Sequence, residues 1–292
     1  MAQAIISRRG GGSGYATITF NGVSTLKKTD VASLSKARSS LGATTVGNYA
    51  LFGGGGINNG TYIGVNTVDA YNTDLTKSTP TALSQARYYL SATAVGNYAL
   101  FGGGYGGGGS YSTVDAYNTS LTRSTPTALS QTRYWLSATA VGNYALFGGG
   151  SAVVDAYNTN LTRSTPTALS EARSQLAATT VGNYALFGGG SGSSTVDAYD
   201  TSLVRSIPTA LSQARGSLAA TTVGNYALFG GGSGPFSSTV DAYYVNNKVQ
   251  VYPGTIYKLG SMSSESTSPT MQEIETTAPI TGYIKIKDAT IN

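Results

Sequence analysis

One unit of sequence recurs five times along the chain, and it restricts the possible folds more than any other feature. Each copy contains an LS-x-x-R element, an FGGG run and a VDAY run. The arginine always precedes the FGGG phenylalanine by 14 positions, as from Arg38 to Phe52, whereas 3 to 12 residues separate FGGG from VDAY. Constant spacing indicates strands that pair in a fixed register, and the segment of variable length indicates a surface loop.

Each copy is expected to form four short strands. In the second copy, residues 90–95 form the first strand, and Gly96 and Asn97 follow as a tight turn that favours positive φ. The YALF and VDAY segments form the second and third strands, and residues 121–125 form the fourth, which a proline ends. The copies repeat every 40 to 49 residues. Four strands in such a period predict an all-β propeller with one copy per blade.

The unit resembles the kelch repeat. The residues of the second copy that carry the resemblance are Arg87, Gly96, Tyr98, Gly102, Gly103 and Tyr117. Kelch repeats usually place a tryptophan on the fourth strand, but here a basic residue stands in that region, with a leucine nearby that is expected to pack in its place. The basic residues are Lys77, Arg123, Arg163 and Arg205, and the leucines are Leu75, Leu121, Leu161 and Leu203. The resemblance implies a kelch-like propeller.

The two ends of the chain suggest a sixth, composite blade. Five full repeats cover about residues 34–252, and residues 1–14 are expected to be a flexible arm. Leu26 lies 8 positions before Leu34, as Leu75 does before Leu83. Residues 15–33 therefore resemble the third and fourth strands of a repeat. A blade that combines residues 15–33 with 253–292 would close the ring and remove its exposed strand edges. The alternative is that residues 260–279, rich in Ser and Thr, form a flexible tail.

Composition excludes several kinds of chemistry. The 292 residues include no cysteine and no histidine, which excludes a Ser-His-Asp triad, a Cys nucleophile and a His- or thiolate-bound metal. We therefore expect no enzyme, no cofactor and no catalytic residue. A net charge of +5 without a basic stripe argues against nucleic acid as a partner. No apolar window is long enough to span a membrane, and the N-terminus lacks the pattern of a secretory signal.

Charged residues also follow the repeat. One arginine and one aspartate recur in each unit, and we expect them to form structural ion pairs within or between blades. These residues are Arg38, Arg87, Arg133, Arg173 and Arg215, with Asp69, Asp115, Asp155, Asp197 and Asp241. Five equivalent carboxylates argue against an acid/base pair, which needs two different environments. The sequence contains no D-x-D-x-D pattern, which would have indicated a calcium site.

The aromatic residues that do not repeat are the best candidates for ligand binding. The two positions after the repeated arginine read SS, YY, YW, SQ and GS, so the second and third units have added aromatic rings. The candidate residues of the links and variable loops are Tyr62, Tyr88, Tyr89, Tyr105, Tyr111, Tyr134, Trp135 and Phe236. In a four-stranded meander these loops and links lie at the same end, so the rings are expected to gather on one face. Aromatic side chains in Gly/Ser-rich loops suit binding surfaces and can stack on sugar rings, although they could also merely cover the blade ends.

These features favour a binding or structural module. The composition, rich in Gly, Ser, Thr, Asn and Tyr, resembles that of bacteriophage virion proteins such as tail or capsid-surface adhesins. That resemblance implies a virion protein whose loop face contacts a host glycan or protein and whose termini attach to other virion proteins. The alternative is a cytoplasmic kelch-type scaffold that binds a protein or peptide. The fold alone does not decide between them.

Overall fold

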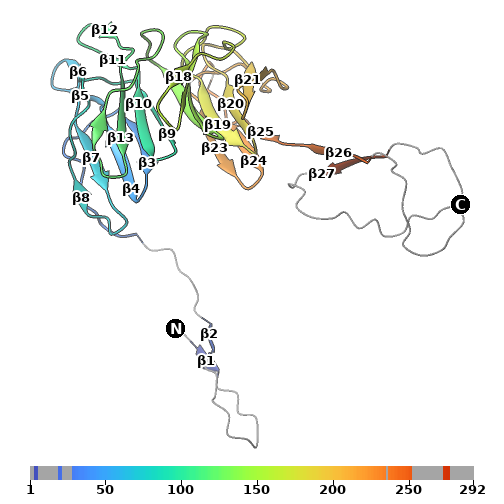
Figure 1. The fold of residues 1–292 in the computed structure, drawn as a ribbon, viewed down its shortest axis with the longest axis horizontal. Helices are drawn as coiled ribbons and strands as arrows, with labels where there is room; N and C mark the ends of the chain where they lie inside the picture. The colour runs from blue at the N-terminus through green and yellow to red at the C-terminus, as the bar shows by residue number, and fades with distance from the viewer. Residues whose placement is uncertain (1–2, 6–18, 22–27, 235, 252–271, 277–292) are drawn as a thin grey trace, which may run out of the picture. The chain divides into compact units, whose positions relative to one another are not determined.

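A computed structural model describes residues 3–5, 19–21, 28–234, 236–251 and 272–276, and these residues form strands and loops without a helix (Figure 1). The chain divides into two compact units, Met1–Ser33 and Leu34–Asn292. In the first unit, β1 (Gln3–Ile5) pairs antiparallel with β2 (Thr19–Asn21). β1 lies within the predicted N-terminal arm, whose other residues are outside the described part of the chain.

In the second unit, each of the first four repeats forms one four-stranded antiparallel sheet, which we call a blade. Blade 1 consists of β3 (Gly42–Val46), β4 (Tyr49–Gly53), β7 (Val68–Tyr71) and β8 (Lys77–Ser78). Blade 2 consists of β9 (Ser91–Val95), β10 (Tyr98–Gly102), β13 (Val114–Asn118) and β14 (Arg123–Ser124). Blade 3 consists of β15 (Leu136–Val141), β16 (Tyr144–Gly149), β17 (Val154–Asn158) and β18 (Arg163–Ser164).

Blade 4 consists of β19 (Ala177–Val181), β20 (Tyr184–Gly188), β21 (Val196–Asp200) and β22 (Arg205–Ser206). Blade 5 has three strands, β23 (Ala219–Val223), β24 (Tyr226–Gly230) and β25 (Val240–Tyr244). The predicted all-β propeller of four-stranded blades is thus confirmed. The predicted sixth blade falls mostly on residues outside the described ranges and stays a prediction.

Three short hairpins add to the blades. The variable loops of the first two units contain β5 (Gly56–Asn58) paired with β6 (Tyr62–Gly64), and β11 (Tyr105–Gly106) paired with β12 (Gly109–Ser110). In Figure 1 both hairpins lie at the upper end of blades 1 and 2. After blade 5, β26 (Asn247–Val251) pairs with β27 (Gln272–Thr276).

The hydrophobic core lies between consecutive blades. The cluster between blades 2 and 3, for example, joins Val95, Leu100 and Val114 of one blade to Phe147 and Tyr157 of the next. Phe147 is fully buried over Gly102, where a Cβ atom would lie 2.7 Å from its ring. Glycine at this position lets the ring approach the backbone of the neighbouring strand, and the same contact recurs from blade to blade.

The leucines of the fourth-strand region largely pack as predicted from the kelch comparison. Leu121, Leu161 and Leu203 are partly buried against the clusters between successive blades. Leu75 is the exception, since 44% of it is exposed. It lies in blade 1, which has no preceding blade among the described residues.

A series of backbone hydrogen bonds also joins the blades, just before their first strands. The amide of Tyr89 donates to the carbonyl of Ser40, and that of Trp135 to Tyr89, with N–O distances of 3.0 and 3.1 Å. The series continues from Gln175 to Trp135 and from Ser217 to Gln175, at 2.9 and 2.8 Å. All five residues have positive φ, between 52 and 58°. One residue of each repeat therefore links its blade to the next.

The repeated tyrosines of the third strands make stability sensitive to alkaline pH. The hydroxyls of Tyr117, Tyr157 and Tyr199 donate to backbone carbonyls. Burial, and to a smaller extent the charge of a nearby aspartate, raises the pKa of each of these tyrosines above the ordinary 10.0. Burial likewise raises the pKa of Tyr243 to about 12. Because the folded pKa is raised, this contribution to stability is complete below pH 10 and declines as the pH rises toward the folded values.

We therefore expect the free energy of unfolding, measured in urea, to fall progressively above pH 10. Absorbance of tyrosinate should show that Tyr117, Tyr157 and Tyr199 ionise only when the chain unfolds, whereas Tyr243 ionises near pH 12 in the folded chain. Removing one of these hydroxyls with Tyr157→Phe should reduce the slope against pH. An unchanged slope in this variant would contradict the assignment.

Candidate functional site

Six aromatic side chains gather at one end of blades 1 to 3. The ring of Tyr88 lies 4.7 Å from that of Tyr62, 4.9 Å from Tyr89 and 5.7 Å from Tyr105 between centroids. Trp135 lies 5.3 Å from Tyr89, and Tyr134 lies 4.7 Å from Trp135 and 5.2 Å from Tyr105. The contacts are edge-on or tilted, as aromatic pairs prefer. We call these six residues the aromatic cluster.

Backbone pairing holds the aromatic cluster together. Tyr88, in the link into blade 2, exchanges two hydrogen bonds with Tyr105 of the variable loop, at 2.9 and 2.7 Å. The hydroxyl of Tyr62 lies 2.9 Å from that of Ser39 and donates to Ser40 at 3.1 Å. All six rings are half-buried, so their edges or faces remain accessible to a ligand. The links and loops meet at one end of the blades, as the meander topology requires.

Two of the candidate residues make no ring contact with the aromatic cluster. Phe236 is 94% exposed and belongs to the variable loop of blade 5. Tyr111 lies beside the glycines of its own loop, where a Cβ on Gly107 would come within 3.0 Å of its hydroxyl. Within the described part of the chain neither ring contacts another aromatic ring. The structure thus brings together six of the eight predicted residues.

A pocket of about 370 Å³ adjoins the aromatic cluster. Its walls come from the five positive-φ positions that link the blades and from the leucine after each of them. These five residues are Ser40, Tyr89, Trp135, Gln175 and Ser217. We call this cavity the axial pocket. Tyr89 and Trp135 belong to both features, so one side of the pocket is aromatic and the other carries an amide and hydroxyl groups.

These five pocket residues adopt a backbone conformation that favours glycine. A residue other than glycine in this conformation is uncommon and costs about 1 kcal/mol or more. Glycine would relieve that strain, yet none of the five blades has it at this position. The leucine that follows is the same in all five blades, whereas the pocket residue differs.

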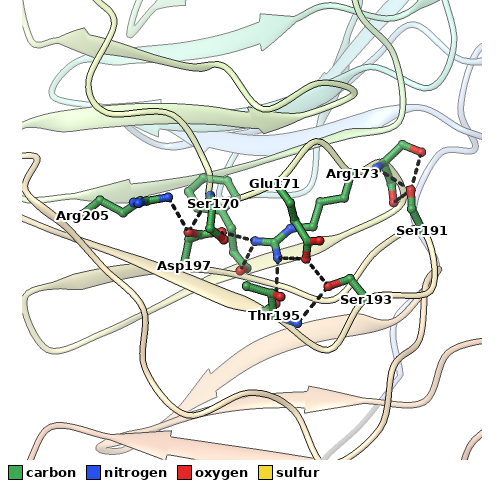
Figure 2. Close-up of polar contacts among 10 residues, drawn as sticks. Ser170, Glu171, Arg173, Ser191, Ser193, Thr195, Asp197 and Arg205 are labelled. Atoms are coloured by element: carbon green, nitrogen blue, oxygen red, sulfur yellow. Dashed lines mark hydrogen bonds and ion pairs between the residues drawn. The ribbon is translucent and has the colours of Figure 1, made fainter.

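The repeated arginines and aspartates pair inside each blade. In blade 2, Arg87 Nη2 lies 2.7 Å from Asp115 Oδ2, and both side chains are fully buried. Arg87 also donates to the carbonyls of Phe101 and Gly103 at 3.1 and 2.8 Å, which ties the link to the second strand and its glycine run. Figure 2 shows the equivalent arrangement in blade 4 around Arg173 and Asp197. The pairs lie within blades, not between them.

Each aspartate accepts bonds from more than one group. Arg123 of the fourth strand approaches Asp115 Oδ1 at 2.7 Å, and the amide of Ser84 donates to the same carboxylate at 3.1 Å. Arg205 has the equivalent role at Asp197, at 3.4 Å (Figure 2). Sequence reasoning missed this second cation, because it noted the fourth-strand basic residues only as a departure from the kelch tryptophan and assigned them no partner. The signal was their constant spacing of 8 positions from the aspartate.

These ion pairs are structural by their geometry. Their carboxylates are 0% exposed in blades 1 to 4 and 16% exposed in blade 5. The residues that the structure describes contain no group of three or more metal-ligating side chains. No helix among them is long and apolar enough to cross a membrane.

Comparison with known proteins supports the fold but identifies no protein family. No protein-family model and no curated protein sequence matches the chain. Among solved structures, the one described as the structure of YjhT is similar, with a TM-score of 0.56 and 10% sequence identity. The similarity covers 69% of this chain and 75% of the other. At this identity the likeness supports the repeat β-propeller fold alone.

Proposed function

We propose that this propeller is a non-enzymatic binding module whose aromatic cluster and axial pocket recognise a neutral glycan. The observation that carries the proposal is the continuous set of six aromatic rings, from which Tyr89 and Trp135 extend to a pocket with polar groups on its other side. Apolar and aromatic walls with a few convergent polar groups are typical of ligand sites. Rigid tyrosine and tryptophan rings offer large contact areas at a low cost in conformational entropy.

The chemistry of the two sides fits a sugar. A pyranose has an apolar C–H face that can stack on Tyr89 or Trp135, and hydroxyl groups on its rim that can bond the Gln175 amide or the hydroxyls of Ser40 and Ser217. Tyrosine is neutral at physiological pH, and burial, followed by the nearby tyrosines, raises the pKa of Tyr88 further above its ordinary value. A neutral site of this kind favours a neutral ligand.

We further propose that the module serves on a bacteriophage virion and contacts a host surface. The support is the composition, which has no cysteine or histidine and few charged residues, together with the near-identical units. The termini would then attach the propeller to other virion proteins. A cytoplasmic kelch-type scaffold that binds peptides is the competing hypothesis, and the experiment below separates the two.

The repeat provides its own substitutions for the test. Tyr89→Ser and Trp135→Gln install the residues that other blades carry at the same positive-φ position, so the fold should tolerate them. Binding should be found first by a glycan array and then measured by titration of the fluorescence of Trp135, the only tryptophan. We expect each variant to weaken glycan binding about 30-fold or more, since an aromatic anchor contributes about 2 kcal/mol. Because Trp135→Gln has no tryptophan to follow by fluorescence, its affinity is measured by calorimetry.

Tyr184→Ser is the matched control. Tyr184 is 36% exposed and lies at the hairpin turn of blade 4, away from the links and variable loops. It should bind as the original chain does. Unchanged affinity in Tyr89→Ser and Trp135→Gln would place the site elsewhere. A blank glycan array combined with retention of a peptide would favour the scaffold.

A further inference from the structure

Five rings of the aromatic cluster lie in three tiers that lead away from the axial pocket. Tyr89 and Trp135 line the pocket, with 5.3 Å between their ring centroids. Tyr88 and Tyr134 precede them in the same two links and are not among the described residues that line it. Tyr105 contacts both rings of this second pair, at 5.7 and 5.2 Å, and within the described part of the chain neither ring of the first. The rings thus form an inner pair, a middle pair and one outer ring.

The axial pocket is small and shallow, and it lies at the inner end of these tiers. Its volume of about 370 Å³ is near the lower limit for ligand pockets, which is about 300 Å³. Two residues of each blade line it, and the described lining includes none that follows the leucine along a first strand. Farther along, the hydroxyls of Thr139 and Thr180 lie 2.8 Å apart and those of Thr179 and Thr222 2.9 Å apart, which joins neighbouring first strands. The pocket therefore suits the end of a chain better than its middle.

Among the described residues, the aromatic surface continues from one side of the pocket. Blades 4 and 5 have Ser174 and Gly216 where the middle pair has tyrosines. Their pocket residues, Gln175 and Ser217, offer an amide and a hydroxyl in place of a ring. Their variable loops have 5 and 7 residues, against 12 and 9 in blades 1 and 2. A chain that crossed the pocket would thus leave it over blades 4 and 5 without a ring to stack on.

We propose that the site binds one end of a neutral oligosaccharide, with the terminal unit in the axial pocket and the next two units along the middle and outer rings. The inference rests on the proposed glycan function and makes it more specific. Ring centroids of neighbouring tiers lie 4.7 to 5.7 Å apart, which is close to the length that one pyranose adds to an extended chain. Three tiers therefore match three sugar units.

One substitution per tier, combined with ligands of different length, tests this order. The probes are the neutral oligosaccharide that binds best on the array and its fragments of one, two and three units, counted from the free end. Tyr105→Ser installs the residue of blade 5, where Ser233 pairs with Gly216 as Tyr105 pairs with the link of blade 2. Tyr88→Ser installs the residue of blade 1, Ser39. The fold should tolerate both changes.

We expect Tyr105→Ser to weaken binding of the three-unit probe at least about fivefold, the effect of losing about 1 kcal/mol, and to leave the shorter probes unchanged. Tyr88→Ser should weaken the two- and three-unit probes and spare the single unit. Trp135→Gln should weaken all three, measured by calorimetry or, for the single unit, by NMR titration. Equal losses for Tyr105→Ser at every length would overturn the proposed order.

The end from which the probe is attached tests whether a free terminus is needed. Immobilised through one end, the three-unit probe should retain the protein. Immobilised through the other end, which blocks the terminal unit, it should retain none at the same concentration, and Tyr184→Ser should behave as the unsubstituted chain does. Equal retention from both ends would mean that the pocket accepts an internal segment, and the inference would be wrong while the glycan function stood. A blank array would refute both.

Discussion

Asp115→Ala is expected to destabilise the protein by about 3–5 kcal/mol, because it leaves Arg87 buried without its counter-ion. Both side chains are fully buried, and the carboxylate also accepts the amide of Ser84. The loss therefore includes an unpaired charge and an unsatisfied backbone donor. Urea denaturation followed by circular dichroism measures it as a lower midpoint with a similar slope.

Arg123→Ala is the internal control for that experiment. Arg123 contacts the same carboxylate at 2.7 Å, but its side chain is 24% exposed. Solvent weakens such a pair, and we expect a cost of about 1 kcal/mol or less. Equal costs for Asp115→Ala and Arg123→Ala would show that the burial of Arg87 is not what makes the aspartate important.

Phe147→Ala is expected to cost about 3–5 kcal/mol, as for other large-to-small substitutions in a tightly packed core. Phe147 is fully buried in the cluster between blades 2 and 3. Its removal would leave a cavity over Gly102 and loosen two blades at once. The measurement is again the urea midpoint, with Phe236→Ala as a control, since Phe236 is 94% exposed.

A double-mutant cycle with Gly102 tests the contact itself. Gly102→Ala should destabilise the original chain, because its Cβ would lie 2.7 Å from the ring of Phe147. In the Phe147→Ala background the same methyl group should be tolerated or even stabilising, since it enters the cavity. Costs that simply add would mean that the two residues do not pack against each other.

Much of this architecture could be predicted from the repeats alone. The constant spacing from Arg87 to Phe101 corresponds to a real constraint, since Arg87 bonds the carbonyl of Phe101. The variable segments are loops, two of which contain hairpins. The repeat thus identified strands, loops and the end of the blades at which aromatic residues gather.

What could not be predicted depends on side-chain geometry. Topology placed Tyr105 and Tyr111 in one loop, but only Tyr105 reaches the rings of the neighbouring link, because backbone pairing aligns it with Tyr88. The axial pocket depends on positive φ at positions occupied by Tyr, Trp, Gln and Ser, and composition gives no sign of such a conformation there. Among the described residues, the exposure of Val223 and Val240 in blade 5 is equally invisible in the sequence, since the equivalent valines of blade 4 are buried.

The recurring contact between a glycine and the phenylalanine of the next blade has a consequence for how this chain changes over generations. Because each of the four junctions between described blades uses the same pair, this contact does not specify which neighbour a blade receives. Recombination between two copies of the gene could therefore delete or duplicate a unit without changing this glycine–phenylalanine contact, although the aromatic cluster of blades 1 to 3 would be altered. The variable loops take no part in this contact, so each of them is free to diverge.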